Sequence, residues 1–124
     1  MGSSNYNGFK ADDKLTGKDD FHAWKMTLDL TLEDQDVTNY VQGKIQEPPS
    51  TATVAAKTKY KKGEIKAKMM IRDSIHKSLV AYIFELGTSK EMYDKLVNMF
   101  KANNANQVLF FKNQLKNLKK GRDY

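Results

Sequence analysis

The sequence predicts an all-α domain, a compact bundle of five or six helices, from three observations. Apolar residues recur at spacings of three and four along most of the chain, which matches the period of an α-helix. Residues that start or stop helices stand between these segments. No comparable segment alternates apolar and polar residues, and no repeat of roughly 20 to 50 residues is present. At 124 residues the chain is long enough for one domain.

The N-terminus is expected to be a flexible arm followed by a helix. Residues 1–13 are rich in Gly, Ser, Asn and Asp, and their Met-Gly-Ser-Ser start is typical of an expression-tag remnant. The folded domain is predicted over 14–124, and Asp19 or Asp20 is expected to cap a helix ending near Glu33. One stripe of this helix should face the core and carries Phe21, Trp24, Leu28 and Leu32.

Met26 and Leu30 project from another side of the same predicted helix. Either the helix is buried on two faces, or these two side chains offer an apolar surface to a partner. We name Met26 and Leu30 as candidate assembly residues, with burial as the alternative.

Two further helices are predicted around a proline loop. A short one over 37–42 should end at Gly43, and Pro48-Pro49 keep the following loop out of helical conformation. Ser50 or Thr51 is expected to cap a long helix that reaches about residue 74.

The long helix has a packing face and a lysine face. Gly63 on the packing face predicts close approach of a neighbouring backbone, with a kink as the alternative. The packing face carries Ala56, Tyr60, Gly63, Ala67, Ile71 and Ser74. The other face carries Lys57, Lys61 and Lys68, with Glu64 as their expected i,i+3 or i,i+4 partner. A plain solvated face is the alternative.

Two more helices are predicted up to residue 102. The first begins near His76, contains Leu79, Val80, Ile83 and Leu86, and should end at Gly87 in the left-handed conformation. The second opens with a capping box, Thr88-Ser89-Lys90-Glu91. Its apolar residues span nearly half of the circumference, so it should be central: Met92, Tyr93, Leu96, Val97, Met99 and Phe100.

The last predicted helix follows a corner at Asn103-Asn104 and ends near Gly121. Its stripe is Val108, Phe111, Leu115 and Leu118. Leu109 and Phe110 lie off this stripe and are further candidate assembly residues, with burial again as the alternative. We expect the core of the domain to include Phe21, Trp24, Leu28, Met92, Leu96, Phe100, Phe111 and Leu115.

Composition excludes several classes of site. Without cysteine the chain forms no disulfide and no sulfur-ligated zinc site. The net charge of +6 comes almost entirely from lysine, which favours loose attraction to nucleic acid over base-specific recognition. No signal peptide or run of about 18 apolar residues is present, so we expect a cytoplasmic protein that does not contact membranes.

Motifs for catalysis are missing from the sequence. His22 and His76 are far apart and neither has metal-ligand spacing, while the acidic pairs lie in or beside turns. The scattered glycines form no phosphate-binding loop, and no nucleophile motif occurs. We therefore predict no enzyme, no catalytic residue, no cofactor and no metal.

Several segments, in order, resemble the Gag proteins of copia-type LTR retrotransposons. Residues 15–24, LTGKDDFHAW, resemble the family's L-x-G-x-N-[FY]-x-x-W opening, with Asp20 in place of Asn. Residues 88–96, TSKEMYDKL, resemble T-A-K-E-x-W-x-x-L, and 109–121 resemble L-x-x-L-x-x-[LM]-K-x-G. Tyr60, Ala67 and Ile71 match in between, although Tyr60 and Tyr93 replace Trp and Ser89 replaces Ala.

The resemblance, which spans about residues 14–122, implies a capsid N-terminal domain. Relatives pack Gag subunits into virus-like particles around the element's RNA. The implied partners are other copies of the chain, the capsid C-terminal domain of the same polyprotein, and RNA by weak electrostatic contact. Lattice geometry, host and the oligomeric state of the isolated domain do not follow from the sequence.

Two alternative functions stay open. One is a domesticated, Gag-derived host protein. The other is a basic helical module that binds nucleic acid, for which salt-dependent RNA retention would be the signature. Its candidate contacts are Lys57, Lys61, Lys68, Lys112, Lys116, Lys119 and Lys120.

Overall fold

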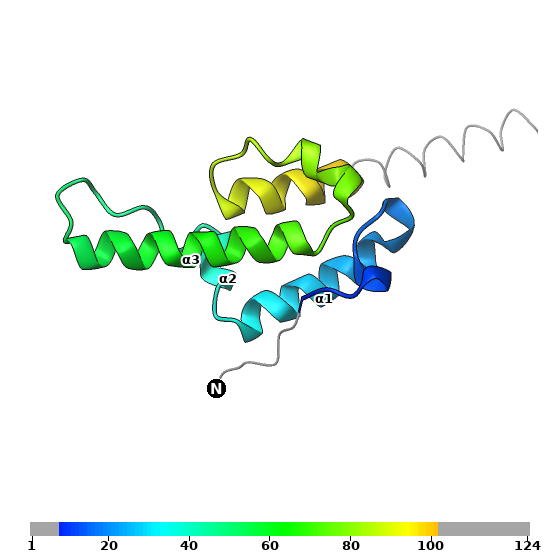
Figure 1. Ribbon diagram of the computed structural model, residues 1–124, viewed down its shortest axis with the longest axis horizontal. Coiled ribbons are helices and arrows are strands. Elements are labelled where there is room, and N and C mark those ends of the chain that lie inside the picture. The colour runs from blue at the N-terminus through cyan, green and yellow to red at the C-terminus, as the bar shows by residue number, and fades with distance from the viewer. Residues whose placement is uncertain (1–7, 102–124) are drawn as a thin grey trace, which may run out of the picture.

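The computed structural model describes residues 8–101, whose regular elements are all helices joined by loops (Figure 1). Its α-helices are α1 (Phe21–Asp34), α2 (Thr38–Val41), α3 (Val54–Asp73) and a helix over 89–101, shown in yellow. Three short 3-10 helices accompany them: η1 (Ala11–Asp13), η2 (Lys18–Asp20) and η3 (Lys77–Tyr82). Over 8–101, extended pairing is limited to the isolated bridge between Leu15 and Ile75. The predicted all-α fold is confirmed.

The core lies where α1, α3 and the 89–101 helix meet. Trp24 at 1% exposure stacks on Tyr93, with ring centroids 6.5 Å apart, and Phe21 lies 6.2 Å from Phe100. Six of the predicted core residues are buried, which confirms them: Phe21, Trp24, Leu28, Met92, Leu96 and Phe100. The other two, Phe111 and Leu115, lie outside the described residues, as does the last predicted helix.

The turn before α1 is held by Asp20, but not in the predicted way. Its carboxylate makes no cap bond to α1. It accepts hydrogen bonds from the Thr16 hydroxyl at 2.6 Å and from the backbone N–H groups of Thr16 and Gly17 at 3.1 and 3.2 Å. Partial burial acts to raise the pKa of Asp20, but these bonds outweigh it and the pKa is lowered. The carboxylate therefore closes the preceding turn.

Short helix α2 packs on α3 through Gly63. The predicted end of α2 is confirmed, because Gly43 has the left-handed φ of 78°. A Cβ atom built on Gly63 would overlap the ring of Tyr40, which is 8% exposed. Gly63 thus makes room for a tyrosine ring, where we predicted a neighbouring backbone. The alternative of a kink does not hold, because α3 continues through Gly63 as one helix. Tyr40 also lies 6.0 Å from the ring of Tyr60.

The start of α3 lies later than predicted. Thr53, not Ser50 or Thr51, caps the helix, and its hydroxyl accepts the Ala56 N–H at 3.1 Å. The Ala52 N–H donates to Pro49 at 2.9 Å, so the prolines are followed by a turn before the helix begins.

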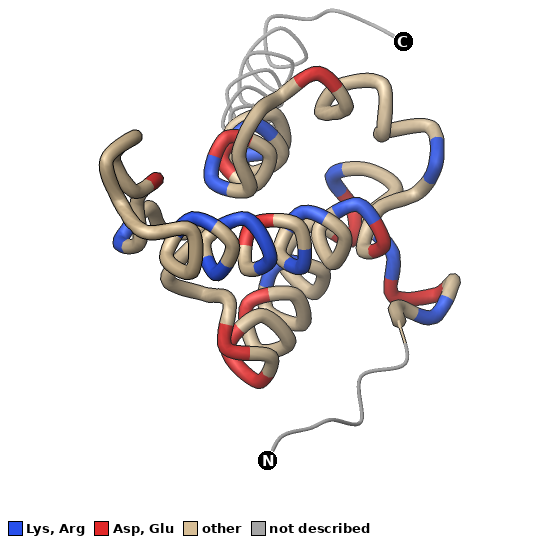
Figure 2. The backbone as a smooth tube through the Cα atoms, turned by 60° about the vertical axis from the view of Figure 1, so that its left-hand side comes forward, with Lys and Arg blue, Asp and Glu red and all other residues tan. Residues whose placement is uncertain are grey.

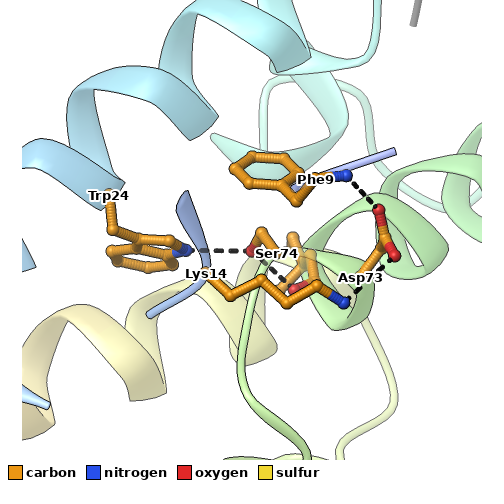
Figure 3. Close-up of polar contacts among 6 residues, drawn as sticks. Phe9, Lys14, Trp24, Asp73 and Ser74 are labelled. Atoms are coloured by element: carbon orange, nitrogen blue, oxygen red, sulfur yellow. Dashed lines mark hydrogen bonds and ion pairs between the residues drawn. The ribbon is translucent and has the colours of Figure 1, made fainter. Parts of the chain in front are cut away.

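The end of α3 anchors two other parts of the chain (Figure 3). The indole N–H of Trp24 donates to the Ser74 hydroxyl at 3.0 Å, which itself donates to the Ile71 carbonyl at 2.7 Å. The Asp73 carboxylate accepts the Phe9 N–H at 2.7 Å and lies 3.6 Å from the Lys14 ammonium. The described part of the predicted arm is therefore held against α3, while 1–7 lie outside the described residues.

The connection between α3 and the 89–101 helix contains a 3-10 helix in place of the predicted helix. Where we expected a helix starting near His76, the chain forms the 3-10 helix η3, which His76 caps by accepting the Ser78 N–H at 3.1 Å. Gly87 does not have the predicted positive φ. Its N–H donates instead to the Glu91 carboxylate at 2.9 Å.

The predicted capping box is confirmed. The Glu91 N–H donates to the Thr88 hydroxyl, and the Thr88 N–H donates to the Glu91 carboxylate, both at 3.1 Å. Because Gly87 donates to the same carboxylate, Glu91 satisfies two backbone donors at the start of this helix.

Candidate functional site

The α1 surface is formed by Met26 and Leu30. They are 64% and 62% exposed, while Trp24 and Leu28 of the same helix are buried. The alternative of burial on a second face therefore does not hold for this chain. The two side chains line a shallow depression of about 400 Å³ together with His22, Lys25 and Asp29. Contact with a partner at this surface stays a prediction.

The rim of the α1 surface is tied to the 89–101 helix. The Tyr93 hydroxyl donates to the Asp29 carboxylate at 2.5 Å, and the Lys25 ammonium lies 2.9 Å from the same carboxylate. Burial, followed by the bond to Asp29, raises the pKa of Tyr93 to about 12. Lys25 also lies 5.9 Å from the centre of the Tyr93 ring. The surface is therefore presented on a fixed helix, and only the i,i+4 spacing of Lys25 and Asp29 hints at this in the sequence.

The lysine groove is a depression of about 800 Å³ beside α3, and the structure brings all three predicted lysines of this helix to it. Two of them hold its walls: the Lys57 ammonium donates to the Ser50 carbonyl at 2.6 Å, and the Lys68 ammonium donates to the Gly87 carbonyl at 2.9 Å. Lys61 is exposed. The three lysines therefore line one groove, which Glu47 also lines.

Glu64 does not pair with these lysines as we predicted. It is 6% exposed and accepts hydrogen bonds from the Ser89 N–H at 2.8 Å and the Ser89 hydroxyl at 2.9 Å. The fold brings the first residue of the 89–101 helix onto α3 at this position. The Glu64 carboxylate is therefore a structural acceptor for Ser89 and forms no ion pair with Lys57, Lys61 or Lys68.

A third surface, the α3 patch, was missed by sequence reasoning. It consists of Lys62, Ile65, Met69 and Arg72, and it lines a depression of about 510 Å³. Ile65 is 44% and Met69 65% exposed. Their i,i+4 spacing away from the packing face is the signal that could have revealed it. The same reasoning missed Tyr82 and Phe84 after α3, which are 54% and 66% exposed.

The remaining candidate residues lie outside the described part of the chain, so they stay predictions. They are Leu109, Phe110, Lys112, Lys116, Lys119 and Lys120. Over 8–101, no group of three His, Cys, Asp or Glu side chains is placed to hold a metal ion. Within the same range, none of the helices combines the length and the apolar character needed to cross a membrane.

Comparison with known proteins gives one family. Residues 26–123 match the family model described as gag-polypeptide of LTR copia-type. No curated protein and no solved structure matches the chain. The matched range begins within α1 and contains α2, α3 and the 89–101 helix.

Proposed function

Since this chain belongs to the gag-polypeptide family of copia-type LTR retrotransposons, we propose that it is a capsid domain whose copies assemble into virus-like particles that package the element's RNA. Gag domains have a structural role, which agrees with the absence of catalytic motifs from the sequence. We place the protein in the cytoplasm and take its partners to be other copies and the capsid C-terminal domain of the polyprotein.

The observation that carries this proposal is the exposed apolar surface on α1. Met26 and Leu30 are one helical turn apart and more than 60% exposed, on a helix whose opposite side is buried. Fully burying two such side chains against another copy would contribute about 3 to 6 kcal/mol at most, at about 1.5 to 3 for each side chain. A contact this small suits a lattice, in which many weak contacts add up through symmetry.

The proposal is tested by electron microscopy of the parent protein expressed alone. We expect regular particles from the unaltered protein and a loss of particles for the double variant Met26→Asp/Leu30→Asp. Val54→Asp is the control, because it exchanges one exposed apolar side chain for an aspartate, as each of the two substitutions does, at a position that is 80% exposed at the start of α3. Amorphous or monomeric protein in place of particles from the unaltered chain would contradict the proposal.

The lysine groove supports a second candidate function, weak RNA binding. Helix α3 carries seven basic and two acidic side chains, and Figure 2 shows Lys and Arg in blue along it. Of the three groove lysines, Lys61 is the one that makes no hydrogen bond to the groove walls, so Lys61→Glu tests binding without disturbing them. We expect the unaltered chain to retain RNA less as the salt concentration is raised, and Lys61→Glu to retain less RNA than the unaltered chain at the same salt concentration. Equal retention by both proteins would count against the groove.

A further inference from the structure

Two exposed apolar pairs lie on different helices and are flanked by opposite charges. We propose that they bind each other between copies: the α3 patch of one chain receives Met26 and Leu30 of the next chain. The inference rests on the proposed self-assembly and specifies its geometry. It predicts a head-to-tail contact in which each copy offers α1 on one side and α3 on the other.

The α3 patch has the features of a receiving surface. Ile65 and Met69 line a depression of about 510 Å³, and basic side chains stand at both ends of the pair, Lys62 before it and Arg72 after it. The depression is also lined by Lys66, which donates to the Gln35 carbonyl, and by Asp73, whose carboxylate binds the Phe9 N–H and lies beside Lys14. Within residues 8–101, no hydrogen bond or ion pair engages the side chain of Lys62 or Arg72. Their charges are thus free to meet carboxylates of another molecule.

The α1 surface has the complementary charge. Helix α1 carries one lysine and three carboxylates, and that lysine, Lys25, is already paired with Asp29. The two other carboxylates, Glu33 and Asp34, are exposed at the end of the helix just beyond Leu30. An α1 surface entering the α3 patch would therefore bring acidic side chains toward Lys62 or Arg72.

The spacing of the two pairs also matches. Met26 and Leu30 are four residues apart, as are Ile65 and Met69, so each pair spans about 6 Å along its helix. Two α3 patches facing each other would instead oppose like charges, which disfavours that pairing. The exposed Ile65 and Met69 favour a protein partner over a phosphate backbone at this patch, unlike the lysine groove.

The contact joins different surfaces of the two copies, so it is heterologous. Such contacts close into rings when the rotation between copies permits, and otherwise continue as open arrays. Either outcome extends an assembly beyond a dimer. This is the property that a capsid building block needs.

Charge reversal tests the pairing in the full 124-residue chain. One variant is Glu33→Lys/Asp34→Lys, and the other is Lys62→Glu/Arg72→Glu. Each alone should self-associate about tenfold more weakly or worse, because its contact opposes like charges. An equimolar mixture should regain association, because every contact between the two variants then joins opposite charges. Sedimentation velocity over a concentration series measures this, with circular dichroism to confirm that each variant folds.

The outcomes separate this inference from the proposed function. Restored association in the mixture supports the head-to-tail contact. If the unaltered chain and both variants associate equally, or if only the α1 variant is weakened, the pairing of α1 with α3 is wrong while self-assembly stands. If Lys62→Glu/Arg72→Glu loses RNA binding and keeps self-association, the patch is a nucleic-acid surface and the inference fails. An unaltered chain that never associates over the concentration series would also overturn the head-to-tail contact, whereas the proposed function fails only if the parent protein forms no particles.

Discussion

Replacing Gly63 with alanine sets helix propensity against tertiary packing. In an isolated helix Gly→Ala is favourable by about 1 kcal/mol. In this chain the added Cβ would overlap Cζ, the hydroxyl and Cε2 of Tyr40, so the ring must leave its place. Overpacking of this kind costs about 1 to 3 kcal/mol, and an overlap with two ring atoms and the hydroxyl oxygen belongs at the upper end of that range. We expect Gly63→Ala to lower the free energy of unfolding by about 2 kcal/mol after the propensity gain.

Urea denaturation followed by Trp24 fluorescence measures this change. The matched background is Tyr40→Leu, in which the obstructing ring is gone. There Gly63→Ala should become stabilising by about 1 kcal/mol, so that the sign of the effect reverses. Stabilisation by Gly63→Ala in the unaltered protein, or the same loss in both backgrounds, would refute the assignment of Gly63 to the Tyr40 contact.

Three further predictions follow from the buried and paired polar groups. Ser74→Ala should lower the free energy of unfolding by about 1 to 3 kcal/mol, because the buried Trp24 indole N–H loses its acceptor. Urea denaturation measures this loss, and an unchanged midpoint would contradict the role of that hydrogen bond. The lowered pKa of Asp20 contributes stability that is present above its ordinary value of 3.8 and is lost as the pH falls through the folded-state pKa. Asp20→Asn should therefore flatten the acid side of the stability profile, and an identical profile would count against the Thr16 and Gly17 bonds. The pKa of Tyr93, raised to about 12 from 10.0, contributes stability that is complete below pH 10 and is lost as the pH rises toward 12. Ultraviolet titration compared with the Tyr93→Phe variant should show one phenol that ionises late. Ionisation of Tyr93 near pH 10 would contradict its contact with Asp29.

Helix ends and caps were predicted correctly where they depend on residues close together in the sequence. The capping box of Thr88 and Glu91 and the end of α2 at Gly43 depend on residues within a few positions of each other, and both are confirmed. The core stripe of Phe21, Trp24 and Leu28 follows from helical period alone.

Errors arose where a side chain had more than one possible partner. Asp19 or Asp20 was expected to cap α1, but the Asp20 carboxylate closes the turn at Thr16 and Gly17. Glu64 was expected to pair with lysines three or four residues away, but it binds Ser89, which is 25 residues distant. Both local alternatives were chemically reasonable. The choice between them depended on which donors the fold brought within reach.

For the interaction surfaces, the sequence identified Met26 and Leu30 as apolar residues off the core stripe, but it did not decide between burial and exposure. Whether these side chains are buried depends on the elements around α1, because a helix is covered only where another element packs against it. The Ile65 and Met69 pair was missed for the same reason, since apolar residues at helical spacing read equally as core or as surface.

By itself, the sequence determined the helical class, most helix positions and the resemblance to copia-type Gag proteins, because period, capping and motif order are properties of the chain. Only the tertiary structure decided which apolar side chains stay exposed, which carboxylates are buried and which lysines line a groove. Those outcomes depend on contacts between residues far apart in the sequence, and the local pattern is compatible with more than one set of such contacts.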